Sequence, residues 1–149
     1  MIFTSHMLAG AAVASNISST PMAITLALFS HYLVDSIPHS EYSIKNIQEG
    51  KWKKSYFDFL KIFLDFSVGI ILILILSKNP FIAILGGITA ILPDGLTFLG
   101  FIFPNNKILS LHQKIHYQGA HYWRNIKISS LGKFLAQVLI ISLSIFFLL

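Results

Sequence analysis

Histidine and aspartate recur four residues apart in this chain of 149 residues. His31 and Asp35 form a first pair at this spacing, and His112 and His116 form a second. Side chains four residues apart leave the same face of a helix one turn apart. Because imidazole nitrogens and carboxylate oxygens bind divalent metals, each pair is a candidate half of a metal site.

Other candidate ligands flank the first pair. Pro38 follows Asp35 and is expected to end the helix there, because proline lacks the amide hydrogen that a helix interior needs. His39 and Glu41 can then turn back toward the helix end. His6, near the start of the chain, adds a further imidazole.

Two aspartates lie inside apolar stretches, where an unpaired charge is costly. Asp65 is about eight residues, or roughly 12 Å, inside its stretch at 1.5 Å per residue. Asp94 lies between Pro93 and Gly95, which could open the helix locally. A bound metal would account for both carboxylates, although Asp94 could instead satisfy backbone groups that Pro93 frees.

The composition favours a membrane protein that holds its metal through histidine and carboxylate. Hydrophobic residues make up 54% of the chain and charged residues 11%, where a soluble domain has roughly a quarter charged. Without cysteine there is no thiolate ligand and no cysteine nucleophile. Zinc suits such ligands best, with manganese or iron as alternatives, and more than four candidates favour two or more ions. The formal charge of +5 is not arranged as a basic run with interleaved aromatics, so nucleic acid is not an expected partner.

Five apolar stretches predict an all-α bundle of about five transmembrane helices in a single domain, residues 1–149. They cover residues 3–14, 22–37, 57–76, 81–103 and 131–149. The last three approach the ~20 residues needed to cross a bilayer, and the first two are short. The loop over about 104–130 is expected to form a helical or re-entrant cap that carries His112 and His116 over the site.

Basic residues predict how the bundle lies in the membrane, because Lys and Arg concentrate in cytoplasmic loops. Two separate loops carry most of them, namely Lys45, Lys51, Lys53 and Lys54 in one, and Lys107, Lys114, Arg124 and Lys127 in the other. Lys61 and Lys133 begin the stretches that leave those loops, so that only Lys78 falls on the opposite side. The pattern predicts an inner-membrane protein with a cytoplasmic N-terminus, and it places the candidate ligands toward the cytoplasmic face.

Several of the candidates also have a purely structural interpretation. His6 could be an interfacial or packing residue. His31 and Asp35 could be a neutral hydrogen-bonded pair inside the bundle. Asp65 could pair with Lys61, four residues earlier, whose long side chain can reach the interface.

In their order along the chain, these residues resemble the membrane-bound metal-dependent hydrolases, a family that includes the LexA-binding, inner-membrane-associated hydrolases of bacteria. Short motifs over most of the chain carry the resemblance: Thr4-Ser5-His6 with Gly10, His31 with Leu33, Asp35, Pro38 and His39, Asp65 with Gly69, Leu92-Pro93-Asp94, and His112 with His116. It implies a metal-dependent hydrolase with similarity to zinc-dependent phospholipase C. The chain departs from the pattern at Ser36, where an apolar residue is commoner, and at Glu41, where an aspartate is expected. The glutamate keeps a carboxylate at that position.

We therefore expect metal-assisted hydrolysis of a phosphoester in a lipid or lipid-linked substrate. The expected metal ligands, or the residues that orient them, are His6, His31, Asp35, His39, Asp65, Asp94, His112 and His116. Asp94 or Glu41 would take the proton from the attacking water. Arg124 and Lys114 could hold the phosphate, although both also fit a topogenic role. His121, beside two aromatic residues, is typical of an interfacial belt and is expected outside the site.

Two other classes of function stay open at this point. The same ligands could pass a divalent ion or a proton across the membrane, or a metal could hold the helices together without catalysis. A conduit needs polar residues in the outer halves of the spans, yet residues 70–76 and 81–85 are apolar. A one-sided site therefore favours hydrolysis over transport.

Overall fold

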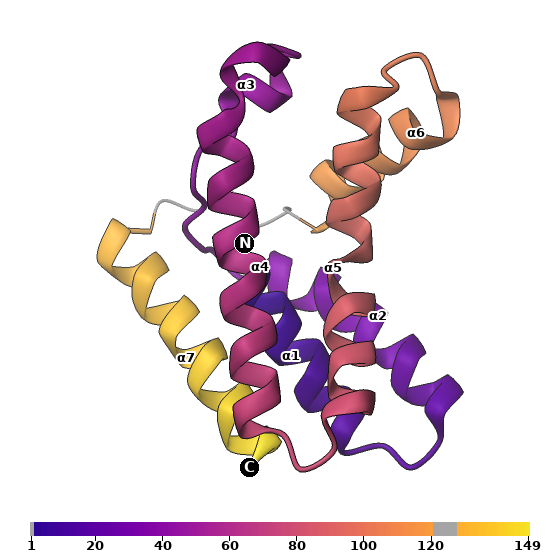
Figure 1. Cartoon of the computed structure of the whole chain (residues 1–149), viewed down its shortest axis with the longest axis vertical. Helices are drawn as coiled ribbons and strands as arrows, with labels where there is room; N and C mark the ends of the chain where they lie inside the picture. Colours follow the sequence, from indigo (N-terminus) through magenta and orange to yellow (C-terminus); the bar gives the residue numbers. More distant parts are fainter. Residues whose placement is uncertain (1, 121–127) are drawn as a thin grey trace.

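The computed structural model describes residues 2–120 and 128–149, and this part of the chain is helical without strands. Its elements are α1 (Phe3–Ser15), α2 (Thr20–Ser36), α3 (Lys45–Gln48), a 3₁₀ turn η1 (Trp52–Lys54), α4 (Tyr56–Leu76), α5 (Pro80–Ile102), α6 (Lys107–Ile115), a π-helical turn η2 (His116–Ala120) and α7 (Ser130–Leu148) (Figure 1). The predicted all-α class is confirmed.

Three of these helices are long and apolar enough to cross a membrane: α4 with 21 residues, α5 with 23 and α7 with 19. α1 has 13 residues and α2 has 17, below the ~20 that a span requires. The prediction of five spans is therefore not confirmed, whereas membrane association is supported. The outward face of α4 agrees with lipid contact, because Phe63, Leu64 and Ile75 are exposed on it.

α1 is the central helix of the bundle. Ten of its 13 residues are buried, and it contacts α2, α4, α5 and α7. Alanine and glycine make up much of its sequence, so neighbouring helices can approach it on all sides. The short first stretch thus forms the core of the bundle, with the longer helices packed around it (Figure 1).

The crossing of α1 and α5 is the closest helix contact that bears on the site. A methyl group at Gly10 would lie 2.4 Å from the Ala90 Cβ and 2.6 Å from the Gly86 carbonyl oxygen. Only glycine permits this approach. His6 lies one turn before Gly10, and its ring stacks on that of His31 in α2 with centroids 4.2 Å apart.

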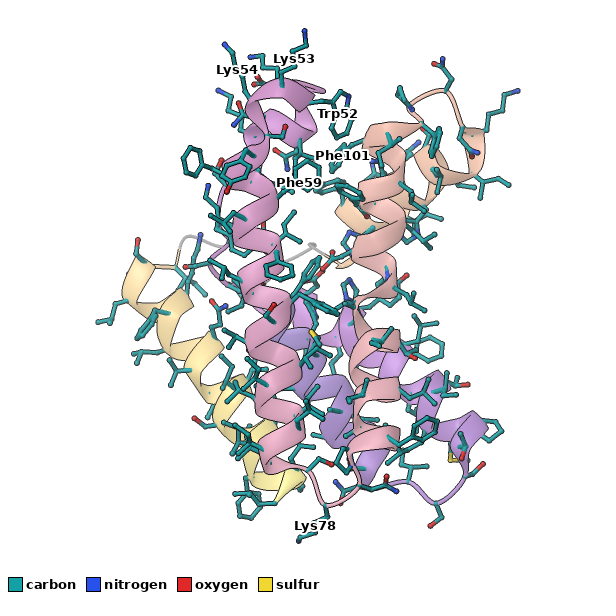
Figure 2. All side chains as sticks on the ribbon, viewed as in Figure 1. Trp52, Lys53, Lys54, Phe59, Lys78 and Phe101 are labelled. Carbon is teal, nitrogen blue, oxygen red and sulfur yellow. The ribbon has the colours of Figure 1, made fainter. Side chains whose placement is uncertain are left out.

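The two ends of the bundle differ in charge and shape. Trp52, Lys53 and Lys54 cap α4 at one end, and Lys78 lies at the other end (Figure 2). α3 and α6 lie at the end that carries Lys53 and Lys54 (Figure 1). Lys53 and Lys54 thus lie at the end opposite Lys78, while the orientation of the bundle in a membrane stays a prediction.

Candidate metal centre

Four side chains from α2, α5 and η2 converge at the middle of the bundle. One ligand atom from each of His31, Asp35, Asp94 and His116 lies within 4.8 Å of all the others. The Nε2 atoms of His31 and His116 each lie 3.3 Å from the Asp35 Oδ2 and 3.8 Å from the Asp94 Oδ1. The His31 and Asp35 spacing of four residues does place both side chains on one face of α2.

These separations are close to those of a tetrahedral metal site. Four donors about 2.0–2.1 Å from zinc stand roughly 3.3 Å from one another. The Asp35 distances match this value, and the Asp94 distances are somewhat longer. The two Nε2 atoms are closer together, at 2.7 Å. Small side-chain shifts would therefore complete four-fold coordination by two imidazoles and two carboxylates.

The hydrogen bonds of His31 direct a lone pair toward this centre. Its Nδ1 lies 2.7 Å from the Ala90 carbonyl oxygen. Because a carbonyl oxygen only accepts, Nδ1 donates, and the neutral ring keeps its lone pair on Nε2. A backbone carbonyl that fixes the tautomer in this way is the usual partner of a metal-binding histidine. Ala90 lies one turn from Pro93, where the hydrogen bonding of α5 is weakened.

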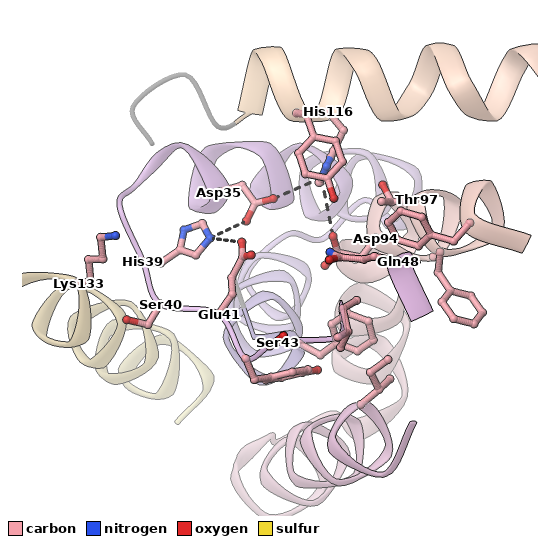
Figure 3. Close-up of a pocket in the computed structure, with 18 of the residues that line it drawn as sticks. Asp35, His39, Ser40, Glu41, Ser43, Gln48, Asp94, Thr97, His116 and Lys133 are labelled. Carbon is pink, nitrogen blue, oxygen red and sulfur yellow. Dashed lines mark hydrogen bonds and ion pairs between the residues drawn. The ribbon is translucent and has the colours of Figure 1, made fainter. Parts of the chain in front are cut away.

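A second group of side chains meets the other oxygen of Asp35. The Nε2 of His6 lies 3.1 Å from Oδ1, and the Nε2 of His39 lies 3.9 Å from it. His39 Nδ1 donates to the Ile37 carbonyl at 2.7 Å, which leaves Nε2 facing the carboxylates. The Glu41 Oε1 is 2.9 Å from that Nε2. Figure 3 shows His39 and Glu41 on one side of Asp35, with His116 and Asp94 on the other.

His112 supports the centre from outside it. Its Nε2 donates to the Pro93 carbonyl at 2.9 Å, and its ring stacks against that of His116 with centroids 5.7 Å apart. His116 itself begins the π-helical turn after α6, and its side chain is buried. The predicted cap is thus helical where the structure describes it, and of its two histidines only His116 joins the four-residue group.

Asp65 has a different set of partners from the one predicted. Its carboxylate accepts hydrogen bonds from the backbone amides of Phe3 and Thr4, at 2.6 and 3.0 Å, and from the Thr4 hydroxyl at 2.6 Å. A carboxylate at a helix N-terminus satisfies free amides and favours the helix dipole. Asp65 therefore caps α1 from α4 and lies outside the four-residue group. Lys61, the alternative partner, instead pairs with Asp58 at 3.7 Å.

A cavity of about 830 Å³ leads to both groups. Its polar wall includes Asp35, His39, Glu41, Asp94 and His116, and its apolar wall comes from α4 and α5 through Phe59, Ile62, Phe98 and Phe101. Figure 2 shows Phe59 and Phe101 facing the space between these helices. The cavity is therefore amphiphilic, with the candidate ligands on its polar side.

Sequence reasoning missed one basic residue of this cavity. Lys133, interpreted only as a topogenic charge, lines the cavity at the start of α7. Lys114 is exposed on α6, and within the described residues it is not part of the cavity wall. Arg124 and His121 lie outside the described residues. The signal for Lys133 was its position in the first turn of an apolar helix, which sequence alone does not connect to the site.

The electrostatics of Glu41 keep it ionised. The hydrogen bond from His39 is the largest influence, and it holds the pKa of Glu41 well below its usual value. Glu41 is thus a carboxylate at neutral pH, on the wall of the cavity.

No protein-family model, curated protein or solved structure matches the chain. The chemistry of this centre therefore has to be inferred from its own side chains.

Proposed function

We propose that this protein is a membrane-embedded metal-dependent hydrolase that acts on a phosphoester of a lipid or lipid-linked substrate. One observation carries the proposal: two imidazole nitrogens and two carboxylates converge on the polar side of an amphiphilic cavity. The resemblance to membrane-bound metal-dependent hydrolases points to the same chemistry. The basic end of α4, with Lys53 and Lys54, supports a cytoplasmic position for the cavity in an inner membrane.

The ligand set fits a divalent transition metal. His31 and His116 would supply nitrogen, and Asp35 and Asp94 oxygen, a mixture that suits zinc first and manganese or iron next. Such an ion supplies Lewis acidity, which makes water a stronger acid and stabilises charge that develops on a phosphoryl group. Two carboxylates among the ligands also offset the charge of the ion in an apolar surrounding.

The remaining steps belong to side chains on the cavity wall. Asp94 is better placed as a ligand than as a base, because its Oδ1 faces both imidazole nitrogens. Glu41 is the candidate base, since it lines the same cavity without belonging to the four-residue group. Lys133, at the cavity edge, would bind a phosphate oxygen.

The apolar wall supports a lipid as the substrate. Phe59 and Phe98 pack edge to face, with centroids 6.1 Å apart, and both line the cavity together with Ile62 and Phe101. An acyl or prenyl chain can bury its surface against these side chains while its headgroup reaches the polar wall. A purely polar substrate would leave these apolar side chains exposed to water.

The opposite half of the bundle argues against a conduit. A cluster of apolar side chains from α1, α4, α5 and α7 fills it, formed by Met7, Leu8, Ala11, Ala12, Ile73, Ala83 and Leu148. An ion that left the four-residue group in this direction would meet only apolar side chains of this cluster, which offer it no ligands. The described core therefore favours a site that is reached from one side.

The test separates metal binding from catalysis. Protein purified in detergent is assayed for bound metal and for hydrolysis of phospholipids and polyprenyl phosphates. We expect wild type to hold metal and to hydrolyse one of these classes, His116→Ala to lose both properties, and Glu41→Gln to keep metal but lose activity. Gln48→Ala, also on the cavity wall, is the matched control and should keep both.

Two results would contradict the proposal. Wild type that binds no divalent metal would remove its basis. Wild type that holds metal but hydrolyses none of the lipids, while losing thermal stability on chelation, would identify the metal as structural.

A further inference from the structure

The Asp35 carboxylate presents its two oxygens to two different sets of histidines. Oδ2 faces His31 and His116 within the four-residue group. Oδ1 instead lies 3.1 Å from His6 Nε2 and 3.9 Å from His39 Nε2. The two sets share only Asp35, and Figure 3 shows His39 on one side of it and His116 on the other.

His6 supplies an independent sign that this second set is incomplete. Its ring is fully buried, and neither ring nitrogen makes a hydrogen bond to any residue in 2–120 or 128–149. The Nε2 nevertheless points at a carboxylate oxygen 3.1 Å away, outside hydrogen-bond geometry. A buried imidazole without a hydrogen bond is destabilising, and such groups in folded proteins usually mark a missing partner.

We propose that a second divalent cation binds between the Asp35 Oδ1 and the Nε2 atoms of His6 and His39, and that Asp35 bridges it to the cation of the four-residue group. This inference rests on the proposed metal-dependent function. A carboxylate that bridges two cations holds them at the separation of about 3.5–4 Å that is typical of two-metal hydrolytic sites.

The chemistry of the second set fits this assignment. His39 Nε2 lies 2.9 Å from the Glu41 Oε1 and 3.9 Å from the Asp35 Oδ1, so a metal bound there would replace the contact with Glu41. Two imidazoles and one carboxylate oxygen make three protein ligands, the usual number in a catalytic zinc site with an open position. Glu41, 2.9 Å from His39 Nε2, lies beside that open position as the base.

Charge also bears on a second cation. Asp35, Asp94 and Glu41 bring three carboxylates to one cavity, whose described wall carries one lysine, Lys133, so carboxylates outnumber basic side chains there. The described lysines nearest in sequence pair elsewhere, Lys45 and Lys51 with Glu49, and Lys61 with Asp58. We expect the second ion to bind more weakly than the first, because His39 belongs to the segment after α2 and stands farther from Asp35.

The experiment counts ions and asks whether they are neighbours. Detergent-purified full-length protein is stripped with chelator and titrated with Zn²⁺ by calorimetry, and Mn²⁺-loaded protein is examined by electron paramagnetic resonance. Wild type should take up about two ions per chain and show exchange-coupled Mn²⁺. His39→Ala should lose the weaker ion and the coupling while it keeps the tighter one. Ser40→Ala, the adjacent cavity residue, should match wild type.

His6→Gln offers a second route to the same answer if His39→Ala fails to fold, since it removes the other nitrogen of the set. A single ion in wild type, lost in His116→Ala, would overturn the second site and leave the proposed function intact. Two ions that both survive in folded His39→Ala and His6→Gln would overturn it too. A wild type without any ion would overturn both proposals.

Discussion

Asp35 and Asp65 are both aspartates within apolar helices, yet their surroundings differ in kind. Asp65 faces two backbone amides and two hydroxyls, all of which donate hydrogen bonds to it. Asp35 faces the Nε2 atoms of four histidines. Asp65 is satisfied by the protein itself, whereas Asp35 belongs to a group of side chains that could hold a metal ion.

The difference shows that depth in a membrane helix does not identify a metal ligand. A carboxylate buried in lipid needs compensation, and a helix N-terminus supplies it as readily as an ion does. What separates the two cases is the chemistry of the facing groups: backbone amides and hydroxyls donate to Asp65, whereas imidazole nitrogens, which can bind a metal, face Asp35. Substitutions at the two aspartates should therefore affect different properties of the protein.

The largest effect is expected from Asp35→Asn. The amide cannot bridge two cations and places an N–H group among imidazole lone pairs, so the protein should lose all bound metal and all hydrolysis. Metal content by mass spectrometry checks the first result, and a lipid phosphoesterase assay checks the second. Asp58→Asn is the control, because Asp58 is equally buried but accepts hydrogen bonds from Asn46 and Ile47. Full metal content in Asp35→Asn would show that Asp35, like Asp65, is not needed for metal binding.

The next effect concerns the two cap histidines. His112 orients His116, because its ring stacks on that of His116 and its Nε2 donates a hydrogen bond to the Pro93 carbonyl. His112→Ala should weaken metal affinity by about 10–100-fold, the usual cost of losing a residue that orients a ligand. His116→Ala should abolish binding at the four-residue group. Isothermal titration with Zn²⁺ measures both, and equal losses in the two variants would place His112 among the ligands.

Asp65→Asn should affect stability and leave metal binding unchanged. The amide keeps one acceptor oxygen but loses the charge that faces the α1 N-terminus, so the free energy of unfolding should fall by about 1–3 kcal/mol. Thermal or denaturant unfolding in detergent measures this loss, with metal content measured on the same sample. Loss of metal from folded Asp65→Asn would show that the capping role is not its only one.

Much of this arrangement could be predicted from local sequence. Apolar runs of spanning length predicted α4, α5 and α7, and the spacing of four residues placed His31 and Asp35 on one face. Pro38 ended α2 near the expected point, since the helix stops at Ser36. These features depend on residues close together in the chain, so local sequence patterns are enough to predict them.

The features that local sequence does not predict depend on contacts between distant residues. Asp65 meets an α1 terminus that lies 61 and 62 residues away in sequence. His112 and His116 have equivalent spacing, but the change from α6 to a π-helical turn at His116 decides which ring enters the centre. The first stretch was interpreted as a short span, whereas its glycine and alanine content suits a helix buried on all sides.

The smallest effect should come from Tyr42→Phe, which tests how far the Asp65 cap depends on any one donor. The Tyr42 hydroxyl donates to Oδ2 at 3.2 Å, a longer bond than the 2.6 Å from the Phe3 amide to the same oxygen. Burial first, and then the Asp65 charge, raise the pKa of Tyr42, so the hydroxyl stays a donor at neutral pH. Its removal should lower the free energy of unfolding by only ~0.5–1.5 kcal/mol and leave metal content unchanged. A loss equal to that of Asp65→Asn would mean that Tyr42, rather than the α1 amides, compensates the carboxylate, and Asp65 would then resemble Asp35 in needing a specific side-chain partner.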